Sequence, residues 1–297
     1  MRLPLLPRAL HQTDRPSATA QATLLFRALE LNRPPDERIV SDRFAPVFLS
    51  PVGRRALAAL RAGGGAVRLG ERSDLGSLAT SVLCRHRFID AHLLEQLPDV
   101  EQVLVLGAGW DSRGWRFAGA IGRRPVIEVD LAPLSRAKRQ VVAAHPDVFG
   151  RGHVTSVEID FRTQTLPERL AGSGFRPGAP TFVVWEGVAM YLSAEAVADT
   201  LTTLAQLCGP GSTVAMDFYQ HVRGWRPYDQ VRRLGELSLG LIGEPVTFAI
   251  APTEVGRLLG RAGLDVAELA TAGTLASRFS TGGRRCDECL YVVAARF

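Results

Sequence analysis

The sequence of 297 residues predicts an α/β fold built on a parallel sheet that helices cover on both faces. From about residue 99 onward, short apolar runs rich in β-formers alternate with helical stretches. The runs are almost continuously apolar, as expected of parallel strands buried on both sides. Hydrophobic residues make up 46% of the chain and charged residues 22%, which is typical of a globular protein with a sizeable core.

The first hundred residues predict a helical cap over residues 20–98, preceded by a flexible leader at 1–19. The expected cap helices share apolar residues at helical spacing and end near Pro or Gly: residues 20–31, 51–61 and 75–97. Pro4 and Pro7 interrupt the Leu-rich start, so it lacks the unbroken apolar region of a secretory signal. We therefore expect a cytoplasmic protein.

Residues 99–297 predict one domain with about seven strands. The expected strands are 102–106, 125–130, 154–159, 181–185, 213–217, 264–270 and 289–295. The expected helices are 112–117, 134–144, 166–170, 194–207 and 253–262, and Thr253 is the expected N-cap of the last one. An insertion at about 219–250 is not required by the alternation of strands and helices.

The first two strands end in residues suited to a nucleoside. Gly107 and Gly109 follow the first strand and allow the backbone to turn tightly and approach a ligand. Asp130 ends the second strand, about twenty residues on, where a carboxylate can accept both ribose hydroxyls. Ser112 occupies the position of the third glycine of a dinucleotide motif, and the sequence contains no phosphate-binding P-loop motif. These features indicate a Rossmann-like site for a nucleoside cofactor.

Five ordered blocks carry a resemblance to a known family: residues 85–90 (RHRFID), 105–113 (VLGAGWDSR), 128–130 (EVD), 160–162 (DFR) and 185–192 (WEGVAMYL). With them the chain resembles the leucine carboxyl methyltransferase family of class I S-adenosylmethionine-dependent methyltransferases, from about Ala22 to Leu207. The family includes protein-phosphatase carboxyl methyltransferases and bacterial polyketide carboxyl O-methyltransferases of secondary metabolism. The resemblance implies a seven-stranded class I methyltransferase sheet with an N-terminal helical cap and a lid insertion after the fifth strand.

The resemblance also implies that S-adenosylmethionine is the cofactor and which residues hold its methionine part. Arg85 would pair with the methionine carboxylate through a charge-assisted contact. Glu186 would face the methionine amino group or the reacting end. Gly107 and Gly109 would meet the cofactor through their backbone.

The resemblance assigns the nucleoside part of the cofactor to three further side chains. Asp130 would hold the ribose, Asp160 would accept a hydrogen bond from the adenine amine, and Phe161 would stack on the ring. The chain departs from the usual family pattern at Trp110 and Ser112, where the family often has a small aliphatic residue and Thr. A substrate wall that includes Trp110 would differ accordingly.

The acceptor is expected to be an oxygen, and a carboxylate is favoured. A carboxylate is ionised at neutral pH and needs no general base, whereas a phenol normally needs one. Tyr219 and His221 follow the fifth strand and are the candidate catalytic residues by position. A phenolic acceptor therefore stays open as an alternative, as does the C-terminal carboxylate of a partner protein.

The insertion and the N-terminal helices are expected to form a lid over an acidic small-molecule substrate. The candidate substrate-binding residues are Trp110, Arg223, Trp225, Arg226 and Tyr228. The arginines would attract the acid, and the aromatic side chains would line the pocket. If Arg223 and Arg226 are both replaced by Ala and the affinity for the substrate is unchanged, this interpretation is wrong.

Other classes of function have weaker support. A nicotinamide oxidoreductase lacks its third glycine here, and an inactive cofactor-binding protein is left open. Basic residues are spread along the chain, whose net charge is +5, so no nucleic-acid partner is expected. No apolar run reaches the ~18–20 residues of a membrane helix, and no membrane partner is expected. Cys286 and Cys289 form a C-x-x-C with no second pair, so we expect buried or incidental thiols and no metal.

Overall fold

The computed structural model describes residues 18–62, 74–150, 154–160, 163–221 and 245–297. Its centre is a seven-stranded sheet with the order β3-β2-β1-β4-β5-β7-β6. The strands are β1 (Gln102–Leu106), β2 (Val126–Asp130), β3 (Val154–Glu158), β4 (Thr181–Trp185), β5 (Thr213–Tyr219), β6 (Asp265–Ala270) and β7 (Leu290–Arg296). The predicted α/β fold is confirmed, and β1 and β4 have the bounds expected from the sequence.

The strand order reverses beside β1, which pairs in parallel with β2 on one side and with β4 on the other. Connections from these strands therefore leave toward opposite sides and open a crevice at their carboxyl ends. In open α/β sheets, ligands bind in such a crevice. The glycine turn after β1 and the segment after β4 both begin there.

The sheet is parallel, as expected, from β3 to β5, and antiparallel at its other edge. β7 runs antiparallel to both β5 and β6. After β6, the chain forms α14 (Ala272–Phe279) and re-enters the sheet from the end at which β6 left it. A strand that starts from that end must run opposite to its neighbour. α14 itself was not predicted from the sequence.

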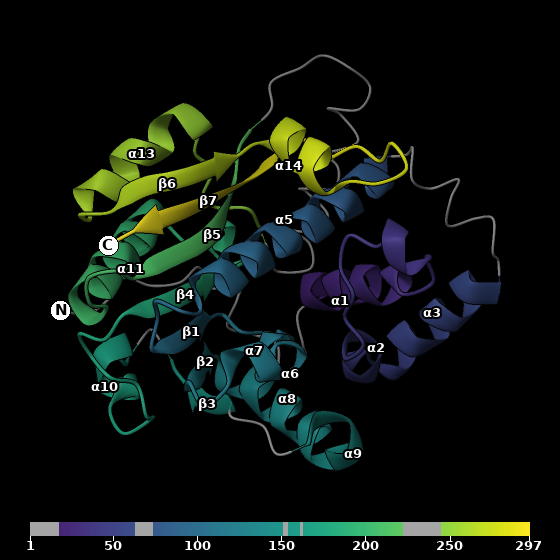
Figure 1. Ribbon diagram of the computed structural model, residues 1–297, viewed down its shortest axis with the longest axis horizontal. Helices are drawn as coiled ribbons and strands as arrows, with labels where there is room; N and C mark the ends of the chain where they lie inside the picture. Colours follow the sequence, from purple (N-terminus) through teal and green to yellow (C-terminus); the bar gives the residue numbers. More distant parts are fainter. Residues whose placement is uncertain (1–17, 63–73, 151–153, 161–162, 222–244) are drawn as a thin grey trace.

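Alternate residues of each strand point into two separate cores. On β1, Leu104 and Leu106 pack in the core covered by α10 (Leu166–Leu170), α11 (Ala194–Leu207) and α13 (Pro252–Arg261). Val103 and Val105 pack in the core covered by α5 (Asp74–Gln96), α7 (Ala118–Ile121) and α14 (Figure 1). Each such buried aliphatic side chain contributes about 1.5–3 kcal/mol to folding.

Within the described ranges, no helix has the length and apolar character needed to cross a membrane.

The N-terminal helices pack beside the sheet around a third core of aromatic side chains. These helices are α1 (Ala18–Glu30), the 3-10 turn η2 (Pro35–Glu37), α2 (Ala45–Phe48) and α3 (Pro51–Ala62). Phe48 of α2 lies 5.4 Å from the ring of Trp110, 6.2 Å from that of Trp115 and 5.0 Å from that of Phe149. The partners belong to the glycine turn, α6 (Arg113–Arg116) and α9 (Pro146–Phe149), so the aromatic cluster joins the cap to the sheet domain.

A buried carboxylate reinforces this junction. Asp42, which is fully buried, accepts hydrogen bonds from Arg27 Nη1 at 2.9 Å and from Ser112 Oγ at 2.8 Å. Arg27 Nη2 also donates to the Trp110 carbonyl oxygen at 2.9 Å. The cap is therefore bonded to the residues that follow the glycine turn.

Two helices next to the site begin with identifiable signals. Ser193 caps α11 by accepting a hydrogen bond from the Ala196 N–H at 3.1 Å. The expected cap Thr253 is wrong, because α13 is preceded by Ala251 and has no side-chain cap. Pro252 occupies its first turn instead, where its fixed φ favours helix initiation.

Candidate functional site

The turn after β1 is fixed by the carboxylate at the end of β2. Gly107 and Gly109 have φ values of 61° and 48°, a region that favours glycine. A Cβ on Gly107 would also lie 2.3 Å from Val188 Cγ2, so the turn packs closely on the segment after β4. The Gly109 N–H donates to Asp130 Oδ2 at 2.6 Å. The two features that the sequence singled out are thus in direct contact.

Asp130 retains the acceptor capacity that a ribose requires. Its Oδ2 binds the Gly109 N–H, and its Oδ1 accepts from the Leu131 N–H at 2.6 Å. A carboxylate offers about four lone-pair sites, so about two remain for the hydroxyls of a ribose. Burial raises the pKa of Asp130, while the two backbone donors oppose that rise. The chemistry of this group fits the predicted nucleoside.

Arg85, on α5, reaches the carboxyl ends of β4 and β5. Its side chain is buried; Nε donates to Glu186 Oε1 at 3.0 Å and Nη1 donates to Asp217 Oδ2 at 2.9 Å. Burial disfavours its charge, yet Asp217 and Glu186 outweigh burial and raise the pKa of Arg85. Nη2 has no hydrogen-bond partner in the part of the chain that the structure describes. This nitrogen is available to a carboxylate of the cofactor.

Glu186 lies at the centre of a cluster of hydrogen-bond donors. Besides Arg85, it contacts His86 Nδ1, 3.0 Å from Oε2, and Arg113 Nη2, 2.8 Å from Oε2. Burial opposes ionisation, but His86, Arg113 and Arg85 together hold the pKa of Glu186 well below its usual range. Both of its oxygens are occupied by protein donors, and its predicted contact with the cofactor amine stays a prediction.

The surrounding hydrogen bonds assign the tautomer of His86. Its Nε2 lies 2.9 Å from Arg116 Nη2, a group that can only donate, so Nε2 carries the lone pair. Nδ1 also lies 2.9 Å from a donor, Arg113 Nη2, but Glu186 is the one side-chain acceptor that the structure describes within hydrogen-bond distance of the ring nitrogens, so the proton is on Nδ1 and is donated to Glu186. Burial and the charge of Arg113 lower the pKa of His86 and keep the ring neutral.

Arg113 connects this cluster to the glycine turn. Its guanidinium is fully buried and donates to three carboxylates, those of Asp90, Asp111 and Glu186. Burial would raise the pKa of Asp111, but Arg113 overcomes that effect and lowers it to about 2. α5, the turn after β1 and the end of β4 are thereby held in one ion-pair network.

The structure places the remaining predicted site residues unequally. Asp160 follows β3, and its N–H donates to Gln164 Oε1 at 2.9 Å. Trp110 is buried against Phe48 in the cap interface. Tyr219 is the last residue of β5 and is buried, while His221 beside it is exposed. Phe161, Arg223, Trp225, Arg226 and Tyr228 lie outside the described residues.

Sequence reasoning missed the role of three residues in this network. Asp217 interrupts the apolar run of β5 near its carboxyl end, the same signal that singled out Asp130 on β2. His86 and Arg113 lie inside family-like blocks, but nothing in the sequence shows that their side chains meet at Glu186. Among the described residues, no three His, Cys, Asp or Glu side chains are grouped as metal ligands.

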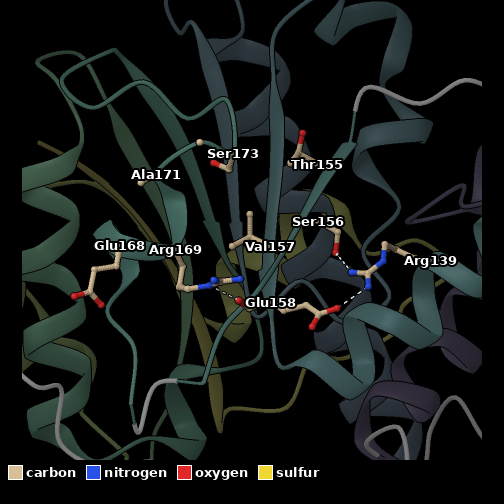
Figure 2. Close-up of a pocket in the computed structure, with 10 residues that line it drawn as sticks. Arg139, Thr155, Ser156, Val157, Glu158, Glu168, Arg169, Ala171 and Ser173 are labelled. Carbon is tan, nitrogen blue, oxygen red and sulfur yellow. Dashed lines mark hydrogen bonds and ion pairs between the residues drawn. The ribbon is translucent and has the colours of Figure 1, made fainter.

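An open depression of about 480 Å³ lies away from this site, along the outer edge of β3 (Figure 2). Arg139 from α8 (Ala132–Ala144) donates to Ser156 Oγ and to Glu158 Oε1, and Arg169 of α10 donates to the Glu158 carbonyl oxygen at 2.8 Å. These arginines cap an edge strand that would otherwise present an unpaired carbonyl. None of the depression's lining residues was predicted to hold cofactor or acceptor.

Comparisons with known proteins agree with this architecture. The sequence model described as leucine carboxyl methyltransferase matches residues 20–205. A Parafrankia protein named as an S-adenosyl-L-methionine-dependent methyltransferase is 36% identical over 218 residues, which is 71% of this chain and 67% of that protein. A Mycolicibacterium paratuberculosis protein of the same description is 32% identical over 215 residues, 70% and 69% of the two chains.

A solved structure shares the fold. A DUF574 family protein from Streptomyces avermitilis superposes with a TM-score of 0.57 over 93% of this chain and 96% of that one. The two sequences are 15% identical, so the likeness concerns the fold alone.

Proposed function

The chain belongs to the leucine carboxyl methyltransferase family, and we propose that it methylates a carboxylate of an acidic small molecule. It is an S-adenosylmethionine-dependent methyltransferase. The nature of the acceptor is the part that we propose. Two features of the structure support it: the occupied titratable groups at the strand ends and the position of the insertion. The sequence adds Arg223 and Arg226, two positive charges within that insertion.

The protein's task in such a reaction is alignment. When bound, the cofactor supplies a methyl group on a positively charged sulfur; the acceptor oxygen would bond to the methyl carbon in line with the sulfur, which leaves as a neutral thioether. Asp130 would hold the ribose, and Arg85 Nη2 would hold the amino-acid carboxylate. Gly187, with φ 69°, has no Cβ; one built there would lie 3.4 Å from Arg85 Nη2, in the space before the guanidinium. Such positioning can contribute roughly 7–11 kcal/mol to lowering the barrier.

The observation that carries the choice of a carboxylate is the occupancy of the titratable groups at the strand ends. Glu186 has a pKa well below its usual range and is a poor proton acceptor. His86 donates through Nδ1 and accepts through Nε2, so neither nitrogen is available as a base. An acceptor that is already ionised at neutral pH needs no base, whereas a phenol does.

The two flanks of the insertion meet above β4 and β5. The Thr247 and Phe248 N–H groups donate to the Met190 carbonyl oxygen at 2.8 and 3.1 Å, in the 3-10 turn η3 (Ala189–Tyr191) after β4. The Ile250 N–H donates to the Tyr219 carbonyl oxygen at 2.9 Å. Both flanks are anchored at the carboxyl ends of the strands, which supports the proposal that the insertion covers the acceptor.

A phenolic acceptor is the second candidate, because one exposed histidine lies at the end of β5. The His221 ring stands edge-on to Tyr219 with 5.9 Å between centroids. In this alternative, His221 would accept the phenolic proton. Methyl transfer to a phenol would then depend on His221, whereas transfer to a carboxylate would not.

The test is methyl transfer from radiolabelled S-adenosylmethionine to a panel of small acids, phenols and peptides with free C-termini. A small-acid product that mild base hydrolyses, formed equally by the wild type and His221→Ala, supports the proposal. A base-stable product that His221→Ala no longer forms establishes the phenolic alternative. Labelling of peptides alone identifies a protein carboxylate as the acceptor. Asp130→Ala is the control for loss of cofactor binding, and calorimetry should show that this variant has a lower affinity for S-adenosylhomocysteine than the wild type.

A further inference from the structure

We propose that Asp217 is a positioning residue that fixes Arg85 so that its remaining nitrogen, Nη2, meets the amino-acid carboxylate of the cofactor. The inference deepens the proposed function and depends on S-adenosylmethionine occupying this site. Asp217 does not touch the cofactor in this proposal. It acts through the guanidinium of Arg85.

The first support is the way Asp217 divides its two oxygens. Oδ2 accepts from Arg85 Nη1 at 2.9 Å, and Oδ1 accepts from the Gly187 N–H at 2.6 Å. The same carboxylate thus holds the arginine and the turn after β4. Because Gly187 lies directly in front of Arg85 Nη2, one side chain sets both the position of the guanidinium and the space before it.

The second support is the completeness of the constraint. Glu186 holds Arg85 Nε and Asp217 holds Arg85 Nη1, so the guanidinium plane is fixed at two of its three nitrogens. Asp217 itself is fully buried on β5, a strand whose described side chains are all buried. Without Asp217, Arg85 would keep one anchor and could rotate about it. A pre-oriented donor binds more tightly than one that must be ordered on binding.

The chain offers a matched control in Glu30. This carboxylate is also buried and also joins an arginine to a backbone N–H: Arg284 donates through Nη1 to Oε2 at 2.9 Å and through Nη2 to Oε1 at 3.0 Å, and the Ile39 N–H donates to Oε1 at 2.9 Å. Arg33 Nε lies farther off, 3.6 Å from Oε2. It lies at the junction of the cap with the segment before β7. Glu30→Gln therefore imposes a similar structural loss away from the cofactor.

The experiment compares two ligands by calorimetry on the full chain. S-adenosylhomocysteine contains the amino-acid carboxylate, and 5′-methylthioadenosine lacks the amino-acid part altogether. Asp217→Asn is expected to weaken the binding of S-adenosylhomocysteine about tenfold or more. This is the effect of losing the charge-assisted contact between Arg85 Nη2 and the ligand carboxylate. The affinity for methylthioadenosine should change less than about twofold, and Glu30→Gln should leave both affinities unchanged.

A double variant separates positioning from general damage. In an Arg85→Lys background, Asp217→Asn should weaken the binding of S-adenosylhomocysteine no further, because Asp217 acts through Arg85 and that side chain has been replaced. Asp217→Ser is the second variant should Asn prevent folding, which thermal unfolding would reveal. Equal losses for both ligands, or no loss for either, overturn the positioning role. Wild-type protein that binds neither ligand overturns the proposed function itself.

Discussion

Lys138 and Glu128 form an ion pair of 2.7 Å, Nζ to Oε2, that is almost completely buried between α8 and β2. The ammonium also lies 5.3 Å from the ring of Trp115 and 5.9 Å from that of Phe48. Burial raises the pKa of Glu128 to about 7, and Lys138 opposes that rise. The pair thus connects the second strand to the aromatic cluster that seats the cap.

Removing the lysine should destabilise the protein in a pH-dependent way. Lys138→Met leaves a buried carboxyl without its partner, and we expect a loss of about 3 kcal/mol in unfolding free energy at pH 8. A pKa raised on folding gives stability that is present below about pH 4.5 and lost as the pH rises through about 7. The loss should therefore be smaller at pH 5. Urea unfolding at both pH values measures it, and Glu128→Gln with Lys138→Met is the control that removes the titration.

His86 should make stability fall in mildly acid solution. Its folded pKa is lowered from an ordinary value near 6.5, so its contribution is present above about pH 6.5 and declines as the pH falls toward the folded value. The decline is at most about 1.4 kcal/mol per pH unit. His86→Asn keeps a donor toward Glu186 but cannot titrate, so its deficit relative to the wild type should narrow below pH 6.5. A deficit that is constant between pH 7.5 and 5.5 would contradict the neutral assignment.

Gly107 should tolerate no side chain. In Gly107→Ala the Cβ would meet Val188 Cγ2 and the backbone would keep its positive φ, so we expect a loss of about 2–4 kcal/mol in unfolding free energy. Adding Val188→Ala should recover the steric part and leave the strain of about 1–3 kcal/mol. Denaturant unfolding of the three proteins separates the two contributions. No recovery in the double variant would show that the clash is relieved by movement of the turn.

Cys286 should be the most reactive thiol. A hydrogen bond with Cys84 lowers the pKa of Cys286, whereas the same bond and burial raise the pKa of Cys84. Burial raises the pKa of Cys208 to about 12. We expect iodoacetamide to modify Cys286 at least about tenfold faster than the other thiols at pH 7, as followed by peptide mass spectrometry. In Cys84→Ala the rate at Cys286 should fall, and an unchanged rate would show that the pairing has no effect.

The sequence was sufficient for features that local patterns encode. The glycine turn, Asp130 and the bounds of β1 and β4 could be predicted because backbone freedom and apolar periodicity act over a few residues. A contact such as Cys84 with Cys286 joins distant segments, whereas the C-x-x-C spacing predicted only buried or incidental thiols. This contact depends on the relative placement of α5 and the segment before β7, which no local pattern specifies.

The candidate site shows the same division. Arg85 and Glu186 could be selected from their blocks, but the block that contains Glu186 gives no sign that two arginines and a histidine converge on it. The sequence shows Asp217 as a charge within an apolar strand, but it does not show that its partner, Arg85, lies on α5. Residue types were therefore predictable, and the network that orients them required the three-dimensional structure.

The reversed direction of β7 determines where the chain leaves the sheet (Figure 1). Phe297, which follows β7, donates its N–H to the Ser212 carbonyl oxygen at 3.1 Å, just before β5 begins. Residue 297 is thus at the opposite end of β5 from Asp217. A fluorophore or surface tether joined after residue 297 would point away from the crevice, so immobilised protein should keep an unobstructed approach for both reactants.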